Sequence, residues 1–586
     1  MKRLNIIITM LALIGGMIAC NSELDVRNPN NPTTYEFGNT EADLEEAIIA
    51  CYNRIRLEGT FSRVGYTMDA VRGDEVWNSS QQWYLEYDKL NSPGTIGIGD
   101  EWIWRDNYHV VNRTNFVLSK VDKVSMSQDS YNKIAGQALF LRALAYYELT
   151  TYYQTVPLIT DYASYSNINT MYAPNNTQDE VFDQIETDLK KAMQMLPSRD
   201  AGGEWAKGRA TCGAAAGYLA RALMFRHKFS EAYDVLKDII AGKYGKYKLT
   251  DDYGDNFREG KEYENNSESL FEVQFLDFGS QGTDEEWTPV NISSQATQGH
   301  AVESNYGPQE FASWGDLAGS PWLYNLFKKE KCTDGRLDPR LYWTLLTYES
   351  EYNTYTNQKT AAYPNGDPRN NTVYQKNITK TPVSNTAQGG IPIAKFTNAR
   401  TNLYKSITVG LHCGINLRLM RYSDVLLRAA ECENEINGPT QTAIDYINEV
   451  RRRVALPDLK LSDFPTADHL FEQIANVERP KEFGCENGRG IDLLRWGFFY
   501  DNDRFNQLIQ HGYYKNDGTA STEELTAETA SASSFQYYSP GHEYFPIYKG
   551  TLDANPKLTG NSANKSEDNG PAFKAKWTIR PVVKLN

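Results

Sequence analysis

The chain has 586 residues, with 75 acidic and 60 basic side chains and a formal net charge of −15. This excess of acid argues against nucleic acid or anionic lipid as the main partner, because both are bound through clustered Lys and Arg. The length permits several domains and a large core. Beyond the first 20 residues no stretch is apolar over the length that a transmembrane helix requires, so we expect a soluble body.

The N-terminus has the pattern of a cleaved lipoprotein leader. Lys2 and Arg3 form a basic start, residues 6–18 are mostly apolar but short for a membrane anchor, and the small residue Ala19 precedes Cys20. This resembles a bacterial lipobox, which predicts cleavage before Cys20 and acylation of that residue. The acyl chains would then be the only attachment to a membrane. The alternative is an ordinary secretory peptide with a chance cysteine near the cut.

Apolar residues at helical spacing predict six helices in the first part of the chain, after a tether rich in Asn and Pro. Leu44 and Ile48 begin the apolar face of the first helix, and Thr177 and Glu180 open another in capping-box spacing. The predicted helices cover residues 40–56, about 100–121, about 130–153, 177–196, 208–228 and 230–242.

Two of these helices resemble a tetratricopeptide repeat. The segment 208–228 is rich in Ala and Gly, which permits close helix packing, and 230–242 follows it after a very short turn. A second pair, 421–438 and 440–457, occurs near the C-terminus with Pro439 between its helices. Any helical hairpin has this appearance, but its recurrence favours a helical-repeat scaffold.

Between residues 242 and 414 the helical pattern mostly disappears. This stretch is rich in Asn, Gly, Thr, Tyr and Trp, with one predicted strand at 269–277 and one predicted helix at 320–329. Long irregular insertions are usually functional or disordered, and the density of aromatic residues argues against disorder.

The cysteines after Cys20 are interpreted as small buried thiols. No CxxC pair occurs, and several of them lie in helical patterns beside Ala and Leu, so a disulfide framework or a metal site is the less favoured reading. They are Cys51, Cys212, Cys332, Cys413, Cys432 and Cys485. We therefore predict no metal and no cofactor.

Several segments together resemble the SusD/RagB family of outer-membrane lipoproteins of Bacteroidota. They are, in chain order, RALAYYELTTYYQTVPLI, ENNSESLFEVQF, DGRLDPRLYWTLL, RYSDVLLRAAECENE, ERPKEFGCENGRGIDLLRWG and YFPIYKGTLDANPKL. The sequence departs from the family pattern where Gln154 and Thr155 replace an aromatic-Gly turn and where Lys549 replaces an acidic residue. The resemblance implies a mainly α fold: a tetratricopeptide-like helical-repeat scaffold with a large, irregular, loop-rich insertion.

The leader and the resemblance together predict the domain organisation. Residues 1–19 are the signal peptide, 20–39 a lipidated tether and 40–586 a single SusD-like domain. Within that domain the scaffold covers about 40–242 and 415–500, the insertion about 243–414, and a C-terminal segment about 501–586. Charged residues of the family-like segments are interpreted as caps and ion pairs that fix helix packing rather than as ligand contacts: Arg421, Glu431, Glu478, Arg479, Asp492 and Arg495.

The resemblance also implies a function. Family members sit on the outer face of the outer membrane, cap a SusC-like TonB-dependent transporter and capture nutrient polymers, most often glycans. Glu23 and Asp25 are similar to the acidic signal for surface export in these bacteria. We therefore expect a lipid-anchored protein of the outer membrane that faces the cell exterior and has a transporter and a glycan as partners.

A glycan site needs an aromatic plane for the C–H face of a sugar and polar groups for its hydroxyls. Two segments supply both, and the resemblance implies ligand contacts from these two regions. The predicted ligand-binding residues are Arg72, Asp74, Trp77, Asn78, Trp83 and Tyr84 in the first segment, with Trp287, Asn305, Tyr306 and Trp314 in the insertion. Trp102, Trp104 and Trp496 lie in helical patterns and are predicted to be core, and Trp322 is left open.

Two alternatives remain open at this point. A surface glycoside hydrolase would need two suitably spaced carboxylates, which 75 acidic residues do not exclude. No HExxH, GxSxG, glycine-rich phosphate loop or histidine cluster occurs, so we predict no catalytic residues and no enzyme activity. A peptide-binding member of the same family is the other alternative, but a peptide site would favour apolar pockets over exposed tryptophan planes.

Overall fold

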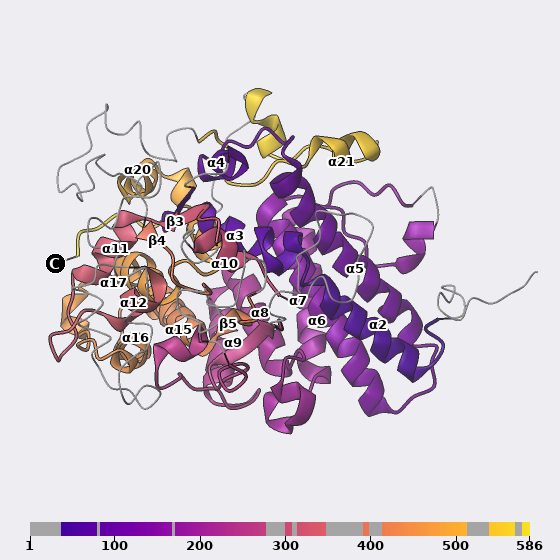
Figure 1. Cartoon of the computed structure of the whole chain (residues 1–586), viewed down its shortest axis with the longest axis horizontal. Coiled ribbons are helices and arrows are strands. Elements are labelled where there is room, and N and C mark those ends of the chain that lie inside the picture. Colours follow the sequence, from indigo (N-terminus) through magenta and orange to yellow (C-terminus); the bar gives the residue numbers. More distant parts are fainter. Residues whose placement is uncertain are drawn as a thin grey trace, which may run out of the picture.

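The computed structural model describes residues 37–78, 82–166, 170–258, 260–276, 299–307, 313–346, 391–397, 413–511, 538–568 and 577–585. Cys20, the tether and Trp287 lie outside these residues, and the side chain of Asn78 is also not described. Most described residues are helical, as Figure 1 shows.

The N-terminal half is a series of helices, each packed on its neighbour in the chain. The long ones are α2 (Glu41–Arg54), α5 (Trp102–Val121), α6 (Gln128–Tyr153), α7 (Gln178–Met195), α8 (Cys212–Phe225) and α9 (Phe229–Ile240). Shorter elements precede α5: the π-helix η1 (Glu58–Ser62), α3 (Val64–Val71), α4 (Gln82–Asp88) and η2 (Gly97–Glu101). The capping box predicted from Thr177 and Glu180 is confirmed at the start of α7.

The C-terminal part repeats the hairpin pattern and packs on the first half. Its helices are α15 (Tyr422–Asn437), α16 (Gln441–Arg453), α17 (Ala467–Gln473), α18 (Arg479–Phe483), α19 (Arg489–Arg495), α20 (Asn502–His511) and α21 (Lys549–Ala554). Helix α15 contacts both α16 and α9, and α19 contacts α3. In Figure 1 the indigo and purple N-terminal helices lie on the right and the orange helices on the left. The predicted mainly α, helical-repeat fold is confirmed.

The strands of the described residues are short and lie in two small sheets. Strands β1 (Val76–Asn78), β3 (Leu317–Gly319) and β4 (Ile391–Pro392) form an antiparallel sheet in the order β1-β3-β4. Strands β2 (Ser269–Val273) and β5 (Leu417–Arg421) form the other sheet. The strand predicted at 269–277 therefore corresponds to β2, which ends at Val273. The insertion also contains α10 (Val302–Tyr306), α11 (Pro321–Lys328) and α12 (Pro339–Thr344). Ser320 caps α11 through its side chain, close to the predicted helix start.

Buried ion pairs connect the helices of the C-terminal part. Arg495 contacts Glu431 at 2.5 Å, and Arg479 contacts Asp492 at 2.6 Å. Both arginines are buried, so their charges are neutralised inside the fold rather than by solvent. These pairs confirm the structural interpretation of the charged family-like residues. The prediction that these six cysteines are buried is also confirmed.

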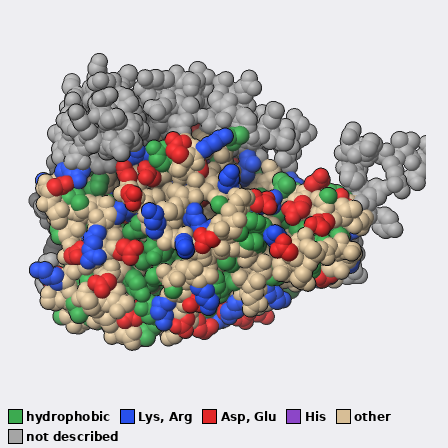
Figure 2. Space-filling model, turned by 90° about the horizontal axis from the view of Figure 1, so that it is seen from below, with side chains coloured by type: hydrophobic (Ala, Val, Ile, Leu, Met, Phe, Trp, Pro, Cys, Tyr) green, Lys and Arg blue, Asp and Glu red, His purple; other side chains and the backbone are tan. Residues whose placement is uncertain are grey.

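The exterior carries charge of both signs. Figure 2 shows one face, on which acidic and basic side chains are interspersed with scattered apolar ones. On this face the net negative charge is therefore not gathered into one patch. Among the described helices, none is both long enough and apolar enough to cross a membrane.

Candidate functional site

The two segments predicted to bind ligand meet in the fold. Strand β1, from the first segment, pairs with β3 of the insertion, with Trp77 opposite Ala318. Asn305 donates a hydrogen bond to the hydroxyl of Tyr84 at 2.7 Å. Residues more than 200 positions apart are thus brought side by side.

An arginine lies between two of the predicted tryptophans. Arg63 follows η1, Trp83 lies on α4, and Trp314 precedes β3. The Cζ atom of Arg63 is 4.6 Å from the ring centroid of Trp314 and 5.8 Å from that of Trp83, both within the range of cation–π contacts. Both indoles are half-buried, so part of each remains accessible. We call these three residues the Arg63 cluster.

Buried polar residues beside the Arg63 cluster form a network that holds it in place. Arg63 pairs with the buried Glu58 at 3.5 Å. Next to Trp83, the hydroxyl of Tyr84 lies 2.7 Å from that of Thr67. Burial raises the pKa of Tyr84, so it stays neutral. The network fixes α4 against α3, and thereby fixes the position of Trp83.

Arg72 and Asp74, predicted to contact ligand, are instead part of the core. The Arg72 guanidinium donates to the carbonyl oxygen of Glu543 and lies 4.5 Å from the ring centroid of Phe545. Asp74 accepts two hydrogen bonds from Arg489, at 2.7 and 2.8 Å. Their partners lie more than 400 positions away in the chain, which is why the local sequence gave no sign of burial.

The other eight predicted residues divide into three groups. Trp77, Tyr84, Asn305 and Tyr306 are also buried, with at most 7% of each exposed, so they support the site rather than face a ligand. This too corrects the prediction, since β1, α4 and α10 pack these four side chains inward. Asn78 and Trp287 remain predictions because no contact of theirs is described. Trp83 and Trp314 alone among the ten combine a described side chain with partial exposure.

Sequence reasoning missed Arg63. It lies outside the aromatic-rich segment that drew attention, and no local pattern distinguishes it from other arginines. The one sequence feature that points to Arg63 is its position directly before the apolar segment 64–71, because a charged residue beside such a segment needs a partner when it is buried.

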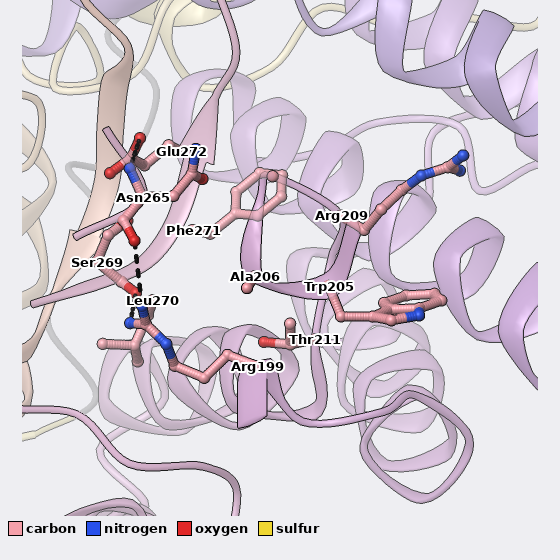
Figure 3. A pocket seen from close by; sticks show the side chains of 11 residues that line it. Arg199, Trp205, Ala206, Arg209, Thr211, Asn265, Ser269, Leu270, Phe271 and Glu272 are labelled. Atoms are coloured by element: carbon pink, nitrogen blue, oxygen red, sulfur yellow. Dashed lines mark hydrogen bonds between the residues drawn. The ribbon is translucent and has the colours of Figure 1, made fainter. Parts of the chain in front are cut away.

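The cavities elsewhere differ in size. One near β2 has a volume of only about 20 Å³, room for a water or two. Arg199 lines it and donates to the carbonyl oxygens of Asn265 and Ser269 at 3.1 Å each (Figure 3). A groove of about 570 Å³ along α2 shares Arg209 and Glu272 with it. A third, of about 510 Å³, lies where the ends of α6 and α8 meet the start of α7. None is lined by a predicted ligand residue.

One cluster has the residue types of a metal site. The ligand atoms of His300, Glu303 and Cys413 lie within 4.8 Å of one another, and all three residues are buried. Both ring nitrogens of His300 are already used: Nε2 donates to the carbonyl oxygen of Ile415 at 3.0 Å, and Nδ1 accepts from the backbone N–H of Val302 at 3.2 Å. Burial lowers the pKa of His300 to about 3, so the ring is neutral. The arrangement fits a hydrogen-bonded core element better than a ligand set for a metal.

Comparison with known proteins gives consistent matches over the chain. A family model described as "SusD family" matches residues 267–563, and one described as "Starch-binding associating with outer membrane" matches residues 24–224. SusD-like protein P25 of Formosa agariphila is 24% identical over 532 residues, which is 86% of this chain and 91% of that protein.

Solved structures share the fold. A SusD superfamily protein from Bacteroides vulgatus is 23% identical, with a TM-score of 0.66 over 90% of this chain and 100% of that one. Surface glycan-binding protein A from Bacteroides thetaiotaomicron, solved in complex with laminarihexaose, is 20% identical, with a TM-score of 0.64 over 89% of this chain and 100% of that one.

Proposed function

Because this chain belongs to the SusD family, we propose that it is a surface lipoprotein that captures a glycan and delivers it to a SusC-like TonB-dependent transporter. The observation that carries the proposal is the Arg63 cluster. Two half-buried tryptophans from distant segments flank one arginine, held there by a buried network.

The Arg63 cluster has the chemistry that sugar binding requires. An indole face attracts the slightly positive C–H face of a pyranose, and the half-buried Trp83 and Trp314 offer such faces. Arg63 is only 3% exposed, so it holds the two indoles in place through its cation–π contacts rather than reaching a sugar hydroxyl. Arg63 is already paired with Glu58, which balances its charge. The Arg63 cluster therefore favours a neutral ligand over an anionic one. The laminarihexaose complex of surface glycan-binding protein A, which shares the fold, is further support for an oligosaccharide.

The remaining parts of the proposal concern location and partner. Acylation of Cys20 would hold the protein at the outer membrane, since each buried CH₂ of an acyl chain contributes about 0.8 kcal/mol. A tethered binder has no channel of its own, so capture is useful only beside a transporter. We further propose binding without catalysis, which an assay for new reducing ends on incubation with glycans checks directly.

The test is calorimetric titration of the full-length protein with a panel of neutral oligosaccharides that includes laminarihexaose, and with a peptide mixture. Trp83→Ala and Trp314→Ala should each weaken binding of the cognate oligosaccharide by about tenfold or more. Loss of a stacking platform costs about 1–3 kcal/mol, by analogy with nucleic-acid bases on aromatic side chains.

Trp322→Ala is the matched control. Trp322 is also half-buried and also faces an arginine, with Arg489 Cζ 5.4 Å from its ring centroid, but it lies outside the Arg63 cluster. It should leave affinity unchanged. Normal oligosaccharide binding by both Trp83→Ala and Trp314→Ala would show that the Arg63 cluster is not the binding site. Binding of peptides instead of sugars would show that the ligand is not a glycan.

A further inference from the structure

The 510 Å³ cavity is lined by residues from three helix ends and the C-terminal segment, and none of them was predicted to bind ligand. Among them are Gln154, Gln178, Phe182, Phe225, His227 and Trp577. Its volume lies within the usual range for small-molecule sites, and its rim is solvent-exposed at Thr177 and Asp179. We call it the Gln154 cavity.

Two of the seven described non-glycine residues with positive φ, Gln154 and His227, line this cavity. Gln154 has φ 64° and ψ −74°, and the N–H of Thr155 bonds the carbonyl oxygen of Tyr153 at 2.7 Å, which together define a γ-turn of the rare, strained kind. His227 also has positive φ, 57°. Glycine would adopt the Gln154 conformation without strain, and this is the turn at which the sequence departs from the aromatic-Gly pattern. Strain of this kind is characteristic of functional positions.

Two polar groups of residues that line this cavity have no hydrogen-bond partner among the described residues. The side-chain amide of Gln154 is half-buried and makes no hydrogen bond to another described residue. The indole N–H of Trp577 is likewise without a partner among the described residues. An amide offers both a donor and an acceptor, which suits a hydroxyl group.

Flat aromatic surfaces form two walls of the cavity. Trp577 stacks on His227 with ring centroids 4.1 Å apart, and Nε2 of His227 donates to the carbonyl oxygen of Arg495 at 2.8 Å, which fixes the imidazole. Phe182 and Phe225 stack on each other at 5.0 Å and are 1% and 6% exposed, so they support the wall from behind, whereas the half-buried Trp577 offers an accessible ring. Such walls suit the C–H faces of a sugar ring.

The charges beside the cavity are already balanced. Arg226 contacts Asp183 at 2.6 Å and Glu186 at 2.7 Å, and Lys228 contacts Glu186 at 2.7 Å. Burial lowers the pKa of His227 to about 4, so its ring is neutral near pH 7. Nothing in this lining favours an ionic ligand.

From the cavity, the strained Gln154 and the aromatic walls, we infer that the Gln154 cavity is a second binding site, separate from the Arg63 cluster, for a short neutral saccharide. Trp577 supplies the stacking surface, and the Gln154 amide bonds a hydroxyl group.

The experiment labels the full-length protein with 5-fluorotryptophan and assigns the Trp577 fluorine resonance by its loss in Trp577→Phe. The probes are D-glucose, D-galactose, D-mannose, maltose and cellobiose, with glucose 6-phosphate and glucuronate as charged counterparts. A neutral sugar should shift the Trp577 resonance saturably, and the charged counterparts should shift it less. The shift should persist in the Trp83→Ala/Trp314→Ala double variant, which separates this site from the Arg63 cluster.

Substitutions at Gln154 separate binding from structure. Gln154→Gly removes the amide and the strain, so it should raise the melting temperature while weakening the sugar at least tenfold. Gln154→Ala keeps the positive φ and should weaken the sugar equally without the gain in stability. The inference is overturned if no neutral sugar shifts the resonance, if the double variant abolishes the shift, or if both Gln154 variants bind as the wild type does.

Discussion

Arg421 is the centre of a buried ion-pair network, and Arg421→Met should destabilise the fold strongly. Its guanidinium contacts Glu268 at 2.6 Å, Glu482 at 2.9 Å and Glu486 at 2.9 Å, and the residue is 1% exposed. Methionine preserves much of the volume but leaves the carboxylates with less compensating charge.

The magnitude follows from one of these carboxylates. Burial raises the pKa of Glu268, but Arg453 and Arg421 together outweigh that effect and hold it at about 2, against an ordinary 4.5. At 1.36 kcal/mol per pKa unit, the interactions of Glu268 favour its ionised form by roughly 3 kcal/mol net of the cost of burial. Arg421→Met removes part of this at Glu268 and leaves Glu482 and Glu486 each without one buried cationic partner, so we expect a loss of roughly 3–5 kcal/mol, the usual result of breaking a buried ion pair.

Urea denaturation followed by far-UV circular dichroism at pH 7 measures the change. Arg421→Lys keeps the charge but not the planar fork, so it should fall between wild type and Arg421→Met. The double variant Arg421→Met/Glu486→Gln should be more stable than the sum of its single variants predicts, because one unpaired carboxylate has been removed. A loss below about 1 kcal/mol in Arg421→Met would refute the reasoning, since an ordinary substitution has that effect.

Three further predictions concern pH, the anchor and the partner. Burial raises the pKa of Glu148 to about 8, so the wild type should lose stability as pH rises from about 4.5 to 8. Glu148→Gln should not show this loss, so the melting temperature of the variant should exceed that of the wild type by an amount that grows with pH. A constant difference across that range would contradict the assignment. Cys20→Ala should leave the protein soluble or mislocalised in cell fractionation and protease shaving, whereas unchanged surface retention would exclude the lipid anchor. Pull-down from gently solubilised membranes should recover a TonB-dependent receptor in near-equal amount, and recovery of the protein alone would count against the partner.

The sequence by itself determined the long helices and the family. The apolar periodicity and caps that define α2, α6 and α7 are local properties, because side chains a turn apart share a face whatever the rest of the chain does. The same holds for the hairpins at both ends. Charged residues such as Arg495 and Glu431 were correctly assigned to packing, since their motifs lie on helices that have to be fixed against one another.

Only the tertiary structure decided which polar and aromatic residues are accessible. Asp74 was a candidate ligand contact until the fold placed Arg489 against it from 415 positions away. Arg63 was unremarked until Trp83 and Trp314 converged on it. Burial and pairing of a loop side chain depend on long-range contacts that no local pattern encodes. The strain at Gln154 is a property of the same kind. The departure from the aromatic-Gly pattern is visible in the sequence, but the positive φ of Gln154 is visible only in the fold.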